Sequence, residues 1–338
     1  MLLVFTTSCG DNSSGSDDTE PDVFSVSNFD FTRGNWQVSG ERSAVAGETS
    51  GTIAASAIFE EDFSTAGTQA FITGTVGGST FEMYMLILLG SEQIEIAMAD
   101  NIDVVLYDFA NASFANGTFA VTNRENTARF TILVASETSF QITFETSVDN
   151  GSTFNELYSL DFTATTEAFP GLNLDIVSHC DTQQHRRFDF ALGNWVVEEN
   201  EYNGAGFIGT RQGNNSVRSI LGGCGILVNR SQASIIADDE TDLETSFRLY
   251  DRQAEMWKFA SLREPSIRLT SMRRHLGDFD ATEPAGSFDL ISIDGSIQNG
   301  RLRYEFPESG IFTEHDETSL NQRQSFVPVF INNYSMPN

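Results

Sequence analysis

Apolar and polar residues alternate with a period of two along most of this chain, whereas helical spacing is hard to find. The segments Phe140–Phe144 and Tyr158–Phe162 each place large apolar side chains at every second position. Between them, Asp149–Gly151 contains Asn-Gly, a typical β-hairpin turn. This pattern predicts a hairpin here and many short antiparallel strands elsewhere.

The chain carries an internal duplication. Residues Phe29–Val38 have the pattern F-D-F-x-x-G-N-W-x-V, which returns 159 residues later as Phe188–Val197. Near the ends of the copies, Glu145–Phe154 matches Glu317–Phe326 at an offset of 172. Each copy therefore represents one domain, and the second copy holds about 13 additional residues, since 172 − 159 = 13.

A sheet of many short strands has two unpaired edges unless it closes on itself. We therefore predict an all-β fold of two tandem antiparallel β-barrels, with a two-sheet sandwich as the second choice. The first barrel is expected over residues 25–168 and the second over residues 186–335. Residues 169–185 form the linker, which begins with Phe-Pro-Gly, a sequence that stops a strand.

The 338 residues carry a formal net charge of −29, and this charge is uneven. Residues 1–170 contain 24 acids and 4 bases, whereas the remainder contains 24 acids and 15 bases. Such a field repels nucleic acid and anionic lipid, so neither is an expected partner. A solvated acidic surface explains the composition, because no calcium-binding loop motif accompanies the acids.

The first ten residues are typical of a shortened bacterial lipoprotein signal. Residues 1–9 are mostly apolar or small and end at Cys9, and residues 10–24 form a polar tether. No basic residue precedes the apolar run, and Thr6 stands where leucine is expected. We expect lipidation of Cys9, with a frayed N-terminus as the alternative. This anchor would be the protein's only membrane contact and would place it in the bacterial cell envelope, facing the periplasm or the cell surface.

Two other cysteines, Cys180 and Cys224, are available as a pair in an oxidising periplasm, and two separate buried thiols are the alternative. Cys224 follows Gly222 and Gly223, but its apolar neighbourhood offers no base to activate a thiol. A tight turn is the better interpretation. Because motifs of hydrolases, metalloproteases and nucleotide-binding enzymes are absent from the sequence, we expect a binder and not an enzyme.

Each copy opens with a Gly-Asn-Trp sequence at its first predicted strand. Gly34 and Gly193 would allow the backbone to bend at the base of a barrel. Trp36 and Trp195 would then point inward and close that end. We interpret both indoles as structural plugs, with direct ligand contact from above as the alternative.

This G-x-W opening resembles the lipocalins. The second copy adds Ser216–Gly223, which reads S-V-R-S-I-L-G-G, and Leu249–Trp257, in which Tyr-Asp precedes a tryptophan. Together these segments look like the lipocalin-like bacterial domain-of-unknown-function 1579 family. The resemblance covers residues 186–330, whereas the first copy keeps only the opening and closing signatures. It implies a barrel that is either packed or holds one small apolar ligand.

The candidate ligand-binding residues are therefore Trp195, Arg218, Trp257 and Trp36. Arg218 stands in an apolar segment, so it must be paired or lie at a rim. It could stack on Trp195 or anchor an anionic head group, with Trp257 as a wall of the same cavity. No cofactor is expected, and haem bound through His315 is the alternative tested below.

The leading hypothesis is a lipid-anchored protein whose second barrel binds a small hydrophobic or amphipathic molecule. A second hypothesis is that both barrels are filled and that the protein is a structural or protein-interaction module of the envelope. A third is a hydrolase or isomerase at the barrel mouth, which would require Glu314 or Asp316 to converge with His315 on a cavity. The oligomeric state stays open.

Overall fold

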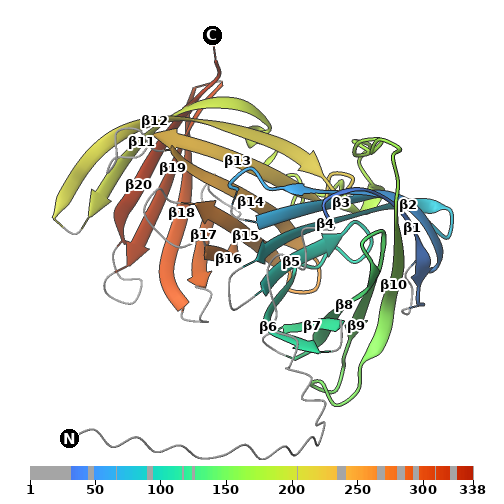
Figure 1. Ribbon diagram of the computed structural model, residues 1–338. Coiled ribbons are helices and arrows are strands. Elements are labelled where there is room, and N and C mark those ends of the chain that lie inside the picture. The colour runs from blue at the N-terminus through green and yellow to red at the C-terminus, as the bar shows by residue number, and fades with distance from the viewer. Residues whose placement is uncertain are drawn as a thin grey trace, which may run out of the picture.

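A computed structural model shows two antiparallel β-barrels side by side (Figure 1). The structure describes residues 32–44, 49–65, 67–89, 94–115, 118–123, 126–203, 205–233, 241–264, 271–279, 286–291, 297–308, 310–319 and 326–337. The expected signal, its Cys9 and the tether over residues 10–24 lie outside the described residues.

The first barrel has ten strands, each paired with the next in sequence, and β1 pairs with β10 to close the sheet. The strands are β1 Gly34–Arg42, β2 Gly51–Glu61, β3 Gly67–Val76, β4 Ser79–Leu89, β5 Ile94–Asp100, β6 Tyr107–Ala115, β7 Thr118–Asn123, β8 Ala128–Ser136, β9 Ser139–Thr146 and β10 Asn155–Ala164.

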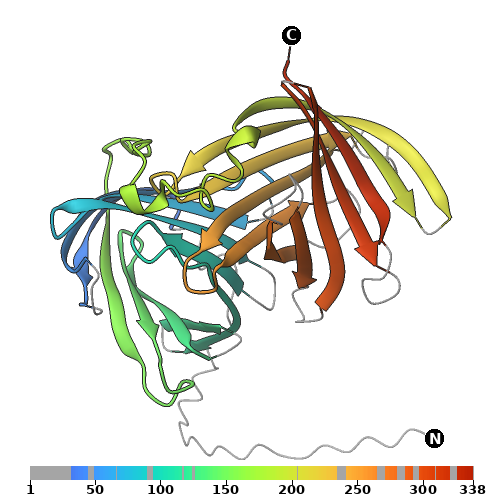
Figure 2. The same ribbon diagram turned by 180° about the vertical axis from the view of Figure 1, so that it is seen from behind.

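The second barrel repeats this topology and closes through β11 and β20. Its strands are β11 Gly193–Asn203, β12 Gly206–Ile220, β13 Gly225–Ala233, β14 Thr241–Asp251, β15 Met256–Glu264, β16 Ser271–Phe279, β17 Gly286–Ile291, β18 Ile297–Glu308, β19 Ile311–Ser319 and β20 Phe326–Ser335. Two 3-10 helices precede it, η2 Ser178–Cys180 and η3 Asp189–Ala191. Figure 2 shows this connecting segment running across the junction of the barrels.

The prediction of two tandem barrels is thus confirmed, including the hairpin between β9 and β10. Its turn uses Asn150 and Gly151 with φ angles of 55° and 81°, a left-handed conformation that Asn and Gly tolerate best. Each barrel has ten strands, two more than the eight of a lipocalin. Barrel diameter grows with strand number, so each barrel encloses more volume than an eight-stranded one.

Aromatic side chains fill the interior of the first barrel. Phe59, Phe81, Phe109, Phe119, Phe130, Phe140, Phe144 and Phe162 all belong to its inward-facing buried cluster. At one end of this cluster, Arg42 is fully buried, donates to the Tyr158 hydroxyl over 2.9 Å and pairs with Asp103 over 2.5 Å. Tyr158 in turn donates to Asp100 over 3.0 Å. The first barrel is therefore a packed structure, and the buried groups Arg42, Tyr158, Asp100 and Asp103 at this end are linked by hydrogen bonds and an ion pair.

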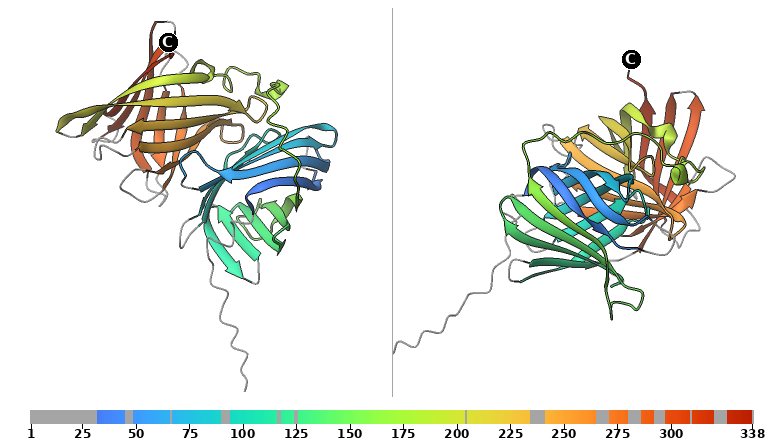
Figure 3. Two further views of the ribbon diagram at one scale, coloured as in Figure 1. Left: turned by 45° about the horizontal axis from the view of Figure 1, so that its top comes forward. Right: turned by 90° about the vertical axis from the view of Figure 1, so that its right-hand side faces the viewer.

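The two barrels meet through their outer walls, as the views in Figure 3 show, and share no sheet. The contact is apolar on both sides. From the first barrel it uses Phe71, Tyr84, Leu86, Leu88, Ala97 and Ala99, and from the second Ile220, Leu227, Phe247, Leu249, Ala260 and Leu262. Strands such as β4 are therefore apolar on both faces, one toward their own interior and one toward the other barrel. The apolar outer surfaces of these strands are thus buried between the two barrels.

Two buried carboxylates cross this junction. Glu82 of β4 accepts hydrogen bonds from the backbone N–H groups of Asn173 (2.6 Å) and Gly222 (2.8 Å). Asp251 of β14 accepts one from the backbone N–H of Leu106 (3.0 Å). Each carboxylate therefore ties one barrel to a backbone segment outside it, in surroundings where an unpaired N–H is costly.

A disulfide joins Cys180 of η2 to Cys224 in the β12–β13 turn, with a Cα–Cα distance of 5.0 Å. The turn contains Leu221, Gly222 and Gly223, which have φ angles of 56°, 55° and 84°. The G-G-C segment is thus a tight turn, as expected, and its cysteine is bonded to another cysteine. Of the two alternatives for these cysteines, the structure has the disulfide.

Among the described residues, no helix has the length and apolar character needed to cross a bilayer.

Candidate functional site

The two Gly-Asn-Trp sequences build the same barrel floor. Trp36 and Trp195 are buried, and the indole Nε1 of each donates to a backbone carbonyl four residues earlier, that of Thr32 or Ala191, over 2.7 Å. Gly34 and Gly193 have φ angles of 127° and 129°, a region that side-chain-bearing residues rarely adopt. This geometry agrees with the interpretation of Trp36 and Trp195 as plugs that close one end of each barrel.

The rings above each floor are duplicated too. In the first barrel, Trp36 meets Phe140 edge-on at 4.7 Å between ring centroids, and Phe140 stacks on Phe162 at 4.4 Å. In the second barrel, Trp195 meets Phe312 edge-on at 4.8 Å, and Phe312 stacks on Tyr334 at 4.1 Å. The only chemical difference between the two triads is the hydroxyl group of Tyr334.

That hydroxyl marks the start of a polar inner wall in the second barrel. Equivalent positions can be assigned from the strand register, starting from the two tryptophans. Glu199, Arg211, Asn215, Arg230, Gln232, Glu314 and Asn332 occupy the positions of Gly40, Ile53, Ala57, Ile72, Gly74, Ile142 and Leu160. One fold thus carries an apolar interior in the first copy and a charged interior in the second.

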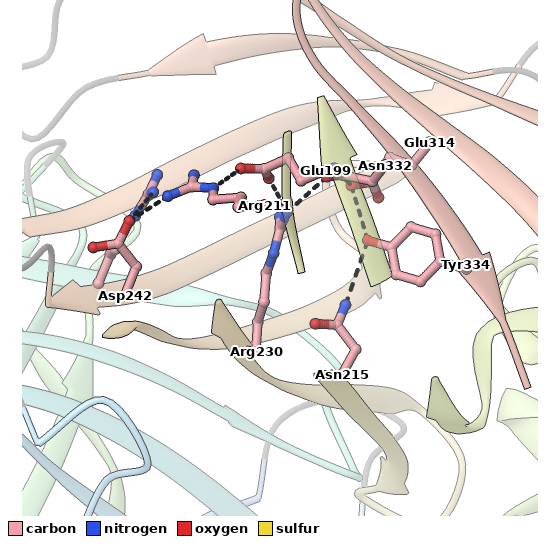
Figure 4. A network of polar contacts seen from close by, with 9 residues as sticks. Glu199, Arg211, Asn215, Arg230, Asp242, Glu314, Asn332 and Tyr334 are labelled. Atoms are coloured by element: carbon pink, nitrogen blue, oxygen red, sulfur yellow. Dashed lines mark hydrogen bonds and ion pairs between the residues drawn. The ribbon is translucent and has the colours of Figure 1, made fainter. Parts of the chain in front are cut away.

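The charged side chains form a continuous network (Figure 4). Arg211 lies between Glu199 and Asp242 and pairs with both, the second over 2.5 Å. Arg230 pairs with the other oxygen of Glu199 and donates to the side-chain oxygen of Asn332 over 2.7 Å. The network therefore runs across the barrel from β14 through β12 and β11 to β20.

A second part of the network surrounds Glu314 of β19. Its carboxylate accepts hydrogen bonds from the hydroxyls of Tyr304 (2.7 Å) and Tyr334 (3.3 Å) and from the amide of Asn332 (3.1 Å). Arg248 lies 3.9 Å away and also covers the ring of Phe259, with its guanidinium carbon 4.7 Å from the ring centre. These contacts connect the charged network to the aromatic residues near the floor.

The ionisation of this wall follows from its burial and its pairs. Burial raises the pKa of Tyr304 well above its ordinary value, and the charge of Glu314 adds to this effect. Burial and Glu314 likewise raise the pKa of Tyr334. Burial disfavours the charged form of Arg230, but Glu199 and other neighbours outweigh it and raise the pKa of that guanidinium. At neutral pH the tyrosines are therefore neutral donors and the arginines are charged.

Five buried polar atoms on the inner wall have no hydrogen-bond partner in the described structure. They are Asn215 Oδ1 of β12, Arg230 Nε and Gln232 Nε2 of β13, and Trp257 Nε1 and Ser261 Oγ of β15. The indoles of the floor are satisfied, so the free N–H of Trp257 sets this third tryptophan apart. An unsatisfied buried polar group costs about 1–3 kcal/mol. These atoms lie on the inner faces of β12, β13 and β15.

The structure corrects the prediction for Arg218. Neighbouring Val217 points into the barrel, so Arg218 points outward, where its guanidinium carbon lies 4.9 Å from the ring centre of Phe71 in the first barrel. Trp257 lies inside, against Phe188 at 4.6 Å. Arg218 therefore neither stacks on Trp195 nor shares a cavity with Trp257; it packs at the junction of the two barrels.

The structure does not place His315 inside the barrel, where the proposed catalytic or haem-binding role would need it. Glu314 points inward, and His315, the next residue on the strand, points to the outer face. There its Nε2 lies 3.5 Å from Glu305, whose side chain is half exposed. His315 and Glu314 thus lie on opposite faces of β19 and do not converge on one cavity.

Two hollows lie outside the barrel interiors or at their ends. The larger, about 940 Å³, lies at the end of the first barrel beside the linker and touches Asp103, Tyr107, His179 and Arg252. A smaller one of about 530 Å³ touches Trp195 and Asn215 of the second barrel. Most of its lining, including Asn214, Ser216 and Asn229, lies on the outer faces of β11, β12 and β13, so this hollow is outside the polar inner wall.

The sequence analysis missed the charged inner wall, although a signal was present. Residues two and four positions after an inward tryptophan share its side of the strand. Four positions after Trp36 stands Gly40, whereas four positions after Trp195 stands Glu199. Comparing the two copies in phase with their tryptophans would therefore have revealed a polar substitution inside the second barrel.

Comparisons with known proteins add little. No family model matches the chain, and no curated protein matches it in sequence. Among solved structures, it is similar to a protein of unknown function from the DUF3598 family of Nostoc punctiforme, with 9% identity and a TM-score of 0.25. The alignment covers 93% of this chain and 99% of that one. The resemblance to the domain-of-unknown-function 1579 family stays a prediction.

Proposed function

We propose that the second barrel binds a small amphipathic molecule and that the first barrel is its structural support. The observation that carries this proposal is the set of five unpaired polar atoms on the inner wall of the second barrel. Equivalent inner positions of the first barrel, such as Ala57, Ile72 and Gly74, offer no polar side chain at all. A guest with both polar and apolar parts would satisfy these atoms and cover the rings near the floor.

The support role of the first barrel rests on where the two barrels touch. The strands with unpaired inward atoms, β12, β13 and β15, present Ile220, Leu227 and Leu262 on their outer faces to the first barrel. A binding wall packed from behind keeps its side chains in place, which lowers the entropy lost when a ligand binds.

We further propose that the protein is a binder and not a catalyst, and that it works in the cell envelope through lipidation of Cys9. The disulfide between Cys180 and Cys224 supports an oxidising compartment. A mass measurement of the protein from bacterial membranes would test lipidation, since a diacyl group on Cys9 changes the mass of the N-terminal peptide.

Tryptophan fluorescence tests the binding proposal directly. Protein purified from a bacterial host is analysed by native mass spectrometry and then titrated with medium-chain alcohols, monoacylglycerols and fatty acids, with retinoids and with haem. Trp257 lies on the proposed wall and Trp36 in the other barrel. A ligand-dependent change should therefore persist in Trp36→Phe and be strongly reduced in Trp257→Phe. A change that depends on Trp36 instead would refute the assignment to the second barrel, and the absence of any bound or titrated ligand would refute binding.

A further inference from the structure

We infer that the ligand of the second barrel carries an uncharged, oxygen-containing head group, and this inference rests on the proposed function. The arginines of the inner wall would at first suggest an anionic ligand. Their partners argue otherwise, and so does the chemistry of the atoms that lack a partner.

The positive charges of the described inner wall are already neutralised. Arg211 pairs with Glu199 and Asp242, and Arg230 also pairs with Glu199. The remaining two, Arg248 and Arg263, pair with Glu314 and Asp242 over 3.9 Å and 3.4 Å. Glu244 stands opposite Arg230 in the strand register, so each of these four arginines faces at least one carboxylate. No inward arginine of the described wall thus has a charge left for a carboxylate ligand.

An additional negative charge would be unfavourable here. A carboxylate inside the barrel would lose its hydration and lie among Glu199, Asp242 and Glu314. On its way in, it would also meet the field of a chain with a net charge of −29. Both effects act against an anion, and neither acts against a neutral molecule.

The unpaired atoms are mostly hydrogen-bond donors. The indole N–H of Trp257, the Nε–H of Arg230 and the amide nitrogen of Gln232 can only donate, and the hydroxyl of Ser261 can donate or accept. A ligand that matches them carries acceptor oxygens, as an ester, a carbonyl or an alcohol does. Because aromatic side chains including Trp257 and Phe259 lie close by, the other end of the ligand is expected to be apolar.

A matched series of eight-carbon probes tests this inference in the full-length protein. The series is octan-1-ol, glycerol monooctanoate, octanoate and octane, titrated at pH 8, where octanoate is ionised. We expect glycerol monooctanoate to bind at least tenfold more tightly than octanoate and octane, with octanol between. Tighter binding of octanoate, or equal binding of octane, would overturn the inference while leaving the second barrel a binding site. Failure of all four probes to bind would overturn the proposed function itself.

Variants then locate the contact. Gln232→Met removes an unpaired donor at nearly constant volume, and Ser261→Ala removes a hydroxyl. Each should weaken glycerol monooctanoate several-fold and leave the weak binding of octane unchanged. Gln212→Ala is the control, because Gln212 lies on the outer face of β12, where it bonds to Glu198 over 3.2 Å. An equal loss in Gln212→Ala, or no loss in either inner-wall variant, would contradict the inferred head-group contact.

Discussion

Reduction of the disulfide between Cys180 and Cys224 should destabilise the second barrel by a predictable amount. The bond closes a loop in which the two cysteines are 44 residues apart. In the chain-entropy model, a loop of this size restricts the unfolded chain by about 13 cal/mol/K, or about 4 kcal/mol at 25 °C. The loop contains β11 and the whole of β12, so the loss should appear in the unfolding of the second barrel.

The assay is urea unfolding of oxidised and reduced protein, followed by tryptophan fluorescence at pH 7. A thiol titration in denaturant establishes the redox state: reduction of the disulfide adds two thiols, and a lipidated Cys9 contributes none. The double variant Cys180→Ala/Cys224→Ala is the control, since reductant should not change its stability. It also reports the packing of the two buried sulfur atoms separately from the loop effect.

The reasoning would be refuted by a specific result. If the thiol count rises by two and the free energy of unfolding changes by less than about 1 kcal/mol, loop closure does not stabilise this barrel. The linker would then be held against the second barrel by its other contacts. The hydrogen bond from the N–H of Val177 to the carbonyl of Gly222, 2.8 Å long, is one such contact.

Three further predictions concern the floor and the titrating groups. Gly193→Ala should cost about 1–3 kcal/mol in urea unfolding, because its φ of 129° strains any side chain, and Gly34→Ala should cost a similar amount in the first barrel. Burial raises the pKa of Glu82, so its pKa in the folded protein lies above that in the unfolded chain. The free energy of unfolding should therefore fall as pH rises from about 4.3 through the raised pKa. Glu82→Gln should flatten that part of the profile of urea midpoint against pH. Burial lowers the pKa of His185 to about 4. The contribution of its neutral imidazole to the free energy of unfolding should therefore be fully present above about pH 6.5 and be lost as pH falls toward 4. An NMR titration that finds an imidazole pKa near 6.5 would contradict this.

The repeated F-D-F-x-x-G-N-W-x-V segment was sufficient to predict the duplication. Alternation in the sequence predicted the strands of the barrels, because side chains on one strand must separate an interior from an exterior. Alternation could not show which outer faces of one barrel are covered by the other barrel. Arg218 illustrates the problem: it stands beside inward Val217 and near Ile220, whose outward side chain is buried against the first barrel. Because Ile220 makes part of the outer face of this strand apolar as well, alternation did not show on which face Arg218 lies. The position of Arg218 therefore depended on the docking of two domains, which local periodicity does not encode.

The charged interior of the second barrel is costly for folding alone, and this cost supports a role beyond structure. The first barrel shows that the same inner positions accept apolar residues, since Ile142 and Leu160 stand where Glu314 and Asn332 stand in the second. Replacing buried ion pairs by well-packed apolar residues is often neutral or stabilising by 1–4 kcal/mol in proteins. Replacing the whole cluster together, with Glu314→Ile, Asn332→Leu, Arg248→Ile, Tyr304→Phe and Tyr334→Phe, leaves no partner of Glu314 unpaired. This variant should therefore keep or raise the melting temperature while weakening binding of glycerol monooctanoate. A variant that fails to fold would instead assign the network to structural stability, and the argument from its cost would fall.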